Sequence, residues 1–333
     1  MLIRFKPKKC RTVLGVDIGA TSVKTLGLSY TNNKPCIDSY GCEVLPSHVI
    51  EGNNVKDIEA LSASIKKLIF PIKSSAIFVV LAVPDSIVIT KTIQCIKNLI
   101  DFELEELVHA EANKYLACPS DELNIDFTVL GTSLSNRSML DVWLVASRSD
   151  PINRRVEAVR RAGLHTNVVD VESYALARVG QLLISNDSCL THNRAVAVLE
   201  INSLLMRLSI LEGGKITHSR EERVAKNSSS IYSEPEESPF HLATFILQVK
   251  RIIEFFFSTS PYKEIEHIFL AGDLARSSNL DYKIQKETGI NTTVVNPFKH
   301  MDISTNLNSE MLENFSPSLL IACGLALRRI DND

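Results

Sequence analysis

The sequence lacks the long apolar run that a membrane-spanning helix requires. Its longest apolar stretches are residues 76–83 and 319–327, and Cys323 and Gly324 interrupt the second. Both stretches are well short of the roughly 18–20 residues needed to cross a bilayer. The basic N-terminus also has no apolar stretch before the first predicted strand, as a signal peptide would have. These absences predict a cytoplasmic protein.

Paired cysteines and an excess of positive charge are also lacking. The 7 cysteines include no CxxC pair and no His/Cys cluster at metal-binding spacing. This pattern fits reduced thiols better than a disulfide framework. Lys and Arg total 36 against 39 Asp and Glu, for a net charge of −3. The charge therefore gives no reason to expect nucleic acid as a partner.

The composition is that of an ordinary globular protein. The chain has 333 residues, of which 45% are hydrophobic and 23% charged, and this length suggests two domains of about 150 residues each. Residues 76–83 are predicted to form a buried central strand because the run is continuous and rich in β-branched residues. Residues 240–257 are predicted to form a long apolar helix, and residues 308–313 a loop.

Residues 13–28 (VLGVDIGATSVKTLGL) indicate a strand, a tight turn and a second strand. Gly19 would let the backbone approach a phosphate, whose oxygens the amides of Ala20, Thr21 and Ser22 could bind. The Asp17 carboxylate would hold Mg²⁺, mostly through water. The alternative interpretation is a plain hairpin with a satisfied Asp17, in which these residues and Lys24 serve the fold alone.

A similar pattern returns 183 residues further on. Residues 194–220 again indicate a strand, a polar turn, a second strand and a third, which places Glu200 at the position of Asp17, Asn202 at that of Gly19 and Arg207 at that of Lys24. Such a duplication predicts two similar α/β halves with a ligand at the carboxyl ends of their strands. A third candidate ligand-binding turn, Gly272-Asp273, follows a predicted strand, and a structural strand-to-helix turn is its alternative interpretation.

At this point the sequence resembles a known family. VDIGATSVK is similar to the first phosphate hairpin of actin-like ATPases, and specifically of the PilM family of type IV pilus assembly proteins and the related FtsA. Further segments similar to that family are KYLACPSDELNIDFTVLG (114–131), VEAVRRAGLHTNVVDVESYALARV (156–179), VKRIIEFFFSTSPYKEIEHIFLAG (249–272) and PSLLIACGLAL (317–327). They occur in the family's order along nearly the whole chain.

The resemblance implies the duplicated, actin-like (ribonuclease H-like) α/β fold. The first lobe is expected at residues 1–190, with a small α+β subdomain inserted at about 86–145. The second lobe is expected at residues 191–333, with its own subdomain, about 221–240, reduced to a loop.

The resemblance also implies a function. Such proteins are peripheral components of the inner-membrane platform of type IV pili, or of related secretion or competence systems. The cytoplasmic N-terminal tail of a PilN-like membrane protein docks in a groove between the small subdomain and the first lobe. The complex is linked to the motor ATPases of pilus assembly and retraction. Homodimer formation by the chain is a further alternative.

Family members bind ATP and Mg²⁺ between the lobes, and here the sequence departs from the pattern. The family's second hairpin has Asp, Gly and small hydroxyl residues where this chain has Glu200, Asn202 and Leu204-Leu205, and its Gly-Gly pair is Gly272-Asp273. We therefore expect weak or absent ATP binding. The degenerate nucleotide-site residues are Asp17 (also the Mg²⁺ ligand), Gly19, Ala20, Thr21, Ser22, Lys24, Glu200, Asn202, Gly272 and Asp273.

The leading hypothesis is an adaptor that captures the extended tail of a PilN-like protein through apolar pockets and backbone pairing at a strand edge. The alternative is an active Mg-ATP-binding, actin-like ATPase whose nucleotide state regulates pilus assembly. No catalytic set can be assembled from the sequence, which argues against an efficient ATPase. The candidate partner-binding residues are Ile87, Ile89, Leu104, Leu107, Val108 and Tyr115.

Overall fold

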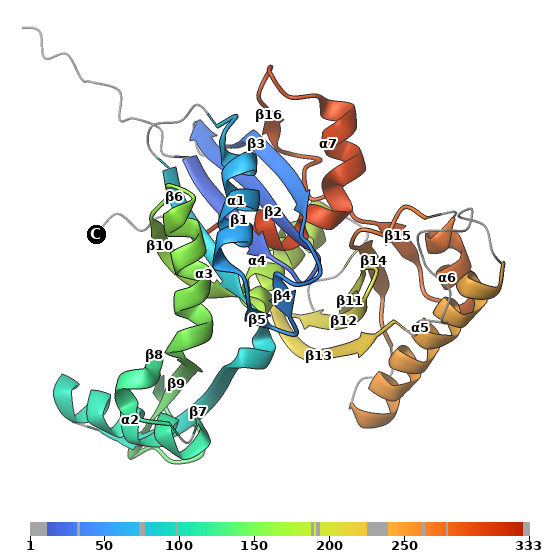
Figure 1. Cartoon of the computed structure of the whole chain (residues 1–333). Coiled ribbons are helices and arrows are strands. Elements are labelled where there is room, and N and C mark those ends of the chain that lie inside the picture. Colours follow the sequence, from blue (N-terminus) through green and yellow to red (C-terminus); the bar gives the residue numbers. More distant parts are fainter. Residues whose placement is uncertain are drawn as a thin grey trace, which may run out of the picture. The chain divides into compact units, whose positions relative to one another are not determined.

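The computed structural model describes most of the chain (Figure 1). The described residues are 12–31, 34–72, 77–97, 99–116, 118–187, 190, 194–224, 239–260, 264–277 and 279–328. The chain divides into two compact units. Unit 1 comprises Met1–Gly15, Thr25–Tyr40 and Tyr174–Asp333, and unit 2 comprises Val16–Lys24 and Gly41–Ser173. The lobes expected at 1–190 and 191–333 stay a prediction, and most of the reduced subdomain expected at 221–240 lies outside the described residues.

A six-stranded sheet with the order β10-β6-β1-β2-β3-β16 contains the first hairpin. Its central strand β1 is apolar and almost completely buried, and β6 coincides with the strand predicted at 76–83. The C-terminal strand β16 pairs in parallel with β3. The strands are β1 (Thr12–Ile18), β2 (Ser22–Thr31), β3 (Lys34–Val44), β6 (Ile77–Val83), β10 (Thr166–Val171) and β16 (Asp302–Ile303).

Two helices of unit 2, α1 (Ile58–Ile69) and α3 (Ser149–Arg161), pack against each other. The Asp57 side chain caps α1 by accepting a hydrogen bond from the Ala60 amide. The guanidinium of the buried Arg155 in α3 donates to the carbonyl oxygen of Asn53 (2.8 Å). This bond fixes the short hairpin formed by β4 (Ile50–Glu51) and β5 (Asn54–Val55) to the helix.

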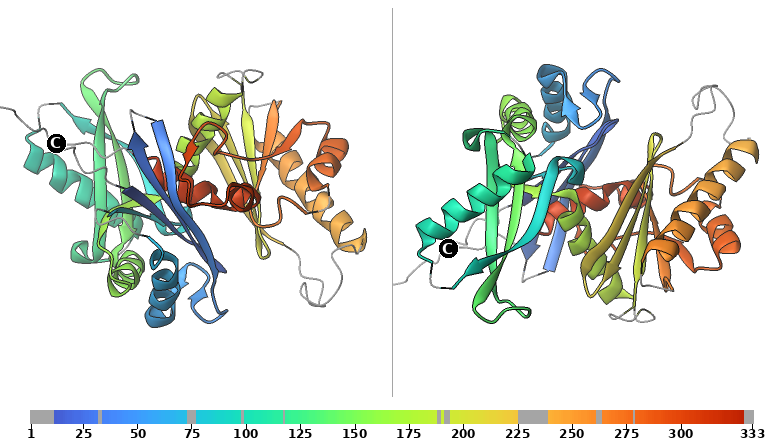
Figure 2. Two further views of the ribbon diagram at one scale, coloured as in Figure 1. Left: turned by 90° about the horizontal axis from the view of Figure 1, so that it is seen from above. Right: turned by 90° about the horizontal axis from the view of Figure 1, so that it is seen from below.

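The second sheet has the order β13-β12-β11-β14-β15. Helices α5 (Pro239–Thr259) and α6 (Leu280–Thr288), orange in Figure 2, lie along one of its faces. The buried side chains of Val249, Ile252 and Phe256 attach α5 to the sheet core. The strands are β11 (Val196–Ile201), β12 (Leu205–Glu212), β13 (Lys215–Arg223), β14 (His267–Ala271) and β15 (Thr292–Val294).

Helix α4 (Glu172–Asn186) meets the C-terminal helix α8 (Leu320–Ala326) at Gly324. A Cβ atom at Gly324 would lie 2.0 Å from the carbonyl oxygen of Ala175, so the two backbones need a glycine to approach this closely. Residues 308–313, predicted as a loop, instead belong largely to α7 (Ser309–Phe315), which the 3-10 turn η3 (Ser316–Leu319) follows. The Asn308 side chain caps α7 by accepting from the Met311 amide.

A small α+β subdomain, from β7 to β9, follows the 3-10 turn η1 (Asp85–Ile87). Its three-stranded antiparallel sheet has the order β7-β9-β8. Helix α2 packs on one face of this sheet. The small subdomain consists of β7 (Val88–Ile96), α2 (Asp101–Leu116), the 3-10 turn η2 (Ser120–Glu122), β8 (Leu123–Thr132) and β9 (Met139–Arg148). Across the described residues of the whole chain, no helix is long and apolar enough to cross a membrane.

Candidate functional site

The turn between β1 and β2 is closed by its own backbone. The Gly19 amide donates to the carbonyl oxygen of Ser22 (3.0 Å), and the carbonyl oxygen of Thr21 accepts from the Leu45 amide (2.8 Å). A Cβ atom at Gly19 would meet only the Ser22 carbonyl oxygen, at 3.3 Å. A side chain at this position would therefore make one tight contact, with the backbone of its own turn.

The predicted ligand-binding residues of this first hairpin differ in their exposure. Asp17, Gly19, Ala20 and Thr21 are half-buried. Ser22 and Lys24, which lie further along β2, are buried. The Ser22 hydroxyl and the Lys24 ammonium are therefore poorly accessible to a ligand.

The corresponding acidic residue in the second hairpin, Glu200, lies in a cluster of opposite charges. Glu200 and Arg207 face each other across β11 and β12. Arg207 Nε lies 3.8 Å from Glu200 Oε2 and 3.6 Å from Glu221 Oε2. The side chains of Arg207 and Glu200 are only 19% and 13% exposed, so water screens this pair weakly. The charge of the Glu200 carboxylate is thus balanced by the Arg207 guanidinium of the neighbouring strand β12.

The other two predicted positions of this half, the Asn202 turn and the Gly272-Asp273 turn, hold each other. Asn202 Oδ1 accepts a hydrogen bond from the Asp273 amide (3.0 Å). Gly272 has φ of 95°, and a Cβ atom there would lie 2.3 Å from the carbonyl oxygen of Ile201. The close backbone contact with β11 accounts for this glycine without a ligand. The structure therefore places the four residues predicted in the second half close together, and a hydrogen bond within the protein joins their two turns. These residues are Glu200, Asn202, Gly272 and Asp273.

These features decide how well ATP and Mg²⁺ would fit. The first hairpin has a carboxylate at Asp17 and a hydroxyl at Thr21, both on half-buried residues. The second half has its Asn202 amide oxygen and its Glu200 carboxylate engaged within the protein. Of the described residues, no three His, Cys, Asp or Glu side chains form a group that could hold a metal ion. The engaged groups of the second half fit a phosphate clamp poorly, and the nucleotide-site residues stay a prediction.

The predicted partner-binding residues lie in or beside the small subdomain, with different access. Leu104 and Val108 are buried in the core between α2 and the sheet, and Leu107 packs against it. Ile87 and Ile89 are half-buried. The Tyr115 ring is exposed, with the ammonium of Lys91 5.0 Å from its centroid.

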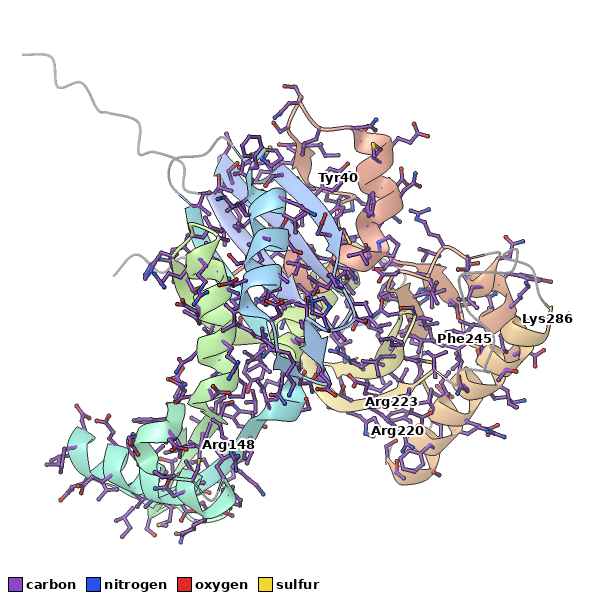
Figure 3. All side chains as sticks on the ribbon, in the orientation of Figure 1. Tyr40, Arg148, Arg220, Arg223, Phe245 and Lys286 are labelled. Carbon is purple, nitrogen blue, oxygen red and sulfur yellow. The ribbon has the colours of Figure 1, made fainter. Side chains whose placement is uncertain are left out.

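The apolar side chains of α2 that the sequence offered as candidates for partner binding, Leu104, Leu107 and Val108, attach the helix to its own sheet. Arg148, labelled in Figure 3, closes the end of that helix by donating to the Leu116 carbonyl oxygen (3.3 Å). The surfaces that the small subdomain offers to a partner are consequently the strand edges and the sheet face away from α2.

The two edges of the small sheet differ. Within the described part of the chain, β7 pairs with β9 alone, from Val88 opposite Ser147 to Ile96 opposite Met139, without a register shift. The other edge strand, β8, has a register shift between Val129 and Gly131. Irregular edges resist the addition of another strand, whereas regular edges accept one. The outer edge of β7 is therefore the better template for an extended peptide.

Comparisons with known proteins agree with this architecture. The family model described as type IV pilus assembly protein PilM matches residues 15–228 and 225–330. A PilM-PilN type IV pilus biogenesis complex contains a similar chain: the similarity covers 95% of this chain and 98% of that one, at 25% identity and a TM-score of 0.74. The ethanolamine utilization protein EutJ from Carboxydothermus hydrogenoformans is similar in fold, with a TM-score of 0.54, 12% identity, and 97% and 90% of the two chains covered. The predicted actin-like α/β fold is confirmed.

Proposed function

The chain belongs to the PilM family of type IV pilus assembly proteins, and from this premise we propose that it is a cytoplasmic adaptor. Its small subdomain docks the cytoplasmic N-terminal tail of a PilN-like inner-membrane protein. Through that partner it lies at the inner membrane, and it links the partner to the motor of the assembly machinery. ATP binding is weak or lost.

The observation that carries the docking role is the outer edge of β7. This nine-residue strand has neither a bulge nor a proline, and its backbone can pair with an incoming extended segment. Backbone pairing supplies affinity that does not depend on the partner's side chains. The similar chain in the PilM-PilN complex makes a PilN-like protein the natural choice of partner.

Peptide binding and hydrogen exchange together test the docking role. A fluorescent peptide with the sequence of the partner's tail is titrated with the full chain, and we expect saturable binding with a Kd on the order of 10 μM. Backbone pairing should also slow the exchange of amides in β7 when the peptide binds. Strand β13, which is also an edge strand, is the internal control and should exchange unchanged.

Two results would contradict the docking role. One is the absence of saturable binding, with a scrambled peptide performing as well as the tail. The other is saturable binding that protects amides elsewhere and leaves those of β7 exchanging at the rate of the free protein.

Weak or lost ATP binding is supported by the second hairpin, where Arg207 neutralises Glu200 and Asn202 holds the Asp273 amide. Calorimetric titration with Mg-ATP should give no saturation below about 1 mM. The alternative, an Mg-ATP-binding ATPase that regulates pilus assembly, is favoured by one feature, the half-buried glycine turn at Gly19 beside Asp17. Micromolar binding that disappears in Asp17→Ala would establish that alternative and exclude the degenerate site.

A further inference from the structure

The face of the small sheet that points away from α2 is open to solvent along both flanks. Strands β7 and β8 present exposed side chains on this face, and the central strand β9 presents half-buried ones. The open face is defined by Thr90, Thr92, Gln94 and Ile96 of β7, Asp126 and Thr128 of β8, and Met139, Asp141, Trp143 and Val145 of β9. Cross-strand partners lie on the same face of a sheet, which fixes this assignment.

Trp143, the one tryptophan of the chain, lies at the middle of the open face. Its cross-strand neighbours are Thr92 on one side and Thr128 on the other. Both neighbours are exposed and short, and Trp143 itself is half-buried, so part of its side chain reaches solvent on this face. Tryptophan in such a place is the residue type that most often dominates the binding energy of an interface.

The charge of the open face has one sign. Of the described residues that define it, Asp126 and Asp141 are carboxylates and none is a lysine or an arginine. Gln94 Nε2 donates to Asp141 Oδ1 (3.3 Å), and this bond directs the carboxylate toward the β7 side. Lys97 and Arg137 lie beyond the strand ends rather than on the face. A cationic side chain from a partner would therefore find a complementary site at Asp141.

The cytoplasmic tail of a membrane protein has the matching chemistry. Cytoplasmic segments close to a membrane span are enriched in lysine and arginine. A strand added to the outer edge of β7 would lie roughly 10 Å from β9, at two strand spacings. A long side chain extending over Thr92 crosses that gap, because threonine does not fill it.

We propose that the open face selects the partner tail by its side chains, with Trp143 receiving a large apolar residue and Asp141 a lysine or arginine. This inference rests on the proposed docking function and adds a recognition pattern to it. Trp143 and Asp141 are two residues apart on one strand, so the tail's apolar and cationic residues must also be two apart. Backbone pairing at β7 supplies affinity, and the open face supplies specificity.

The single tryptophan makes the inference directly measurable. Its fluorescence in the full chain reports on the open face, while the anisotropy of a labelled tail peptide reports binding anywhere on the protein. We expect a shift of the tryptophan emission maximum that saturates at the same peptide concentration as the anisotropy. Trp143→Ala should raise the Kd about 10-fold or more.

Surface variants test the proposal even if the Trp143→Ala variant fails to fold. Thr92→Lys places a cation beside the indole at an exposed position and should weaken binding several-fold. Thr217→Lys is the matched control, an exposed threonine on the edge strand β13, and should bind like the wild type. Asp141→Asn should weaken binding and reduce its dependence on salt, whereas Asp121→Asn, outside the open face, should change neither.

A double-mutant cycle identifies the cation. Replacing the tail's lysine or arginine by alanine should weaken binding to the wild type but have little further effect on Asp141→Asn, because both changes remove one interaction. Additive effects of the two changes would overturn the assignment to Asp141.

Failure of this inference is distinguishable from failure of the docking role. If anisotropy shows saturable binding while the emission of Trp143 is unchanged and Thr92→Lys binds normally, the open face is not the recognition surface and the docking role stands. If anisotropy shows no binding to the wild type, both proposals are wrong.

Discussion

Gly19, in the turn of the first hairpin, leaves little room for a side chain, and Gly272, beside the turn of the second, leaves none. A Cβ atom would have its nearest neighbour at 3.3 Å in the first case and 2.3 Å in the second. The two halves share one strand pattern but use it differently. In the second half a hydrogen bond joins two turns and the backbone contact requires a glycine, whereas the glycine of the first turn makes a single, looser contact.

The largest expected effect comes from exchanging these two glycines for alanine. Gly272→Ala should lower the free energy of unfolding by about 3 kcal/mol, because its φ of 95° and its contact with Ile201 both exclude a side chain. Gly19→Ala should cost about 1 kcal/mol or less. Urea denaturation measures both, and equal losses would remove the distinction between the two turns.

The charge cluster of the second hairpin gives the next effect. Arg207→Met keeps much of the side-chain volume but leaves the carboxylates of Glu200 and Glu221 without their shared cation. We expect a loss of about 2 kcal/mol in urea denaturation. Arg207→Lys, which keeps the charge, is the control and should lose less. A neutral or stabilising Arg207→Met would mean that the cluster does not hold the hairpin.

A smaller effect is expected where the two turns of the second half are joined. Asn202→Ala removes the acceptor of the Asp273 amide and should cost about 1 kcal/mol, whereas Asn202→Asp keeps an acceptor and should cost less. Amide exchange at Asp273 should quicken in the alanine variant alone. Unchanged exchange there would show that this bond does not secure the two turns.

The smallest effect is the response of the second sheet to acid. Burial lowers the pKa of His267 in β14, although the nearby carboxylates of Asp187 and Glu266 oppose the shift. The unfolded chain, with an ordinary histidine pKa near 6.5, then binds a proton more readily than the folded one. Stability should therefore fall as the pH drops through about 6.5, by less than about 1.4 kcal/mol per pH unit.

His267→Gln should flatten that part of the stability profile. An unchanged slope in His267→Gln would place the acid sensitivity elsewhere.

Elements with a strong local pattern were predictable from the sequence. The apolar run at 76–83 became β6, and the long helix predicted at 240–257 is α5 (Pro239–Thr259). The loop predicted at 308–313 was wrong, because α7 is too short to show a helical period. A side-chain cap at Asn308 starts it, and Leu312, buried by tertiary contacts, holds it.

The candidate sites were predictable to different degrees. The positions of the two hairpins and the Gly272-Asp273 turn followed from their spacing. The hydrogen bonds made by their polar groups could not be predicted, because the bond from the Asp273 amide to Asn202 joins residues 71 apart in the sequence. The open face was missed for a similar reason, because the surroundings of Trp143 are formed by residues of two other strands, β7 and β8.

The order of most strands and helices, the chemistry of the turns and the membership of a family follow from the amino-acid sequence alone. Those properties depend on neighbouring residues, through backbone preferences and the periods of apolar side chains. The folded molecule was needed to show which glycine the fold requires, which carboxylate is neutralised and which face of the small sheet is open. These depend on strand register and on contacts between distant segments, which no local pattern records.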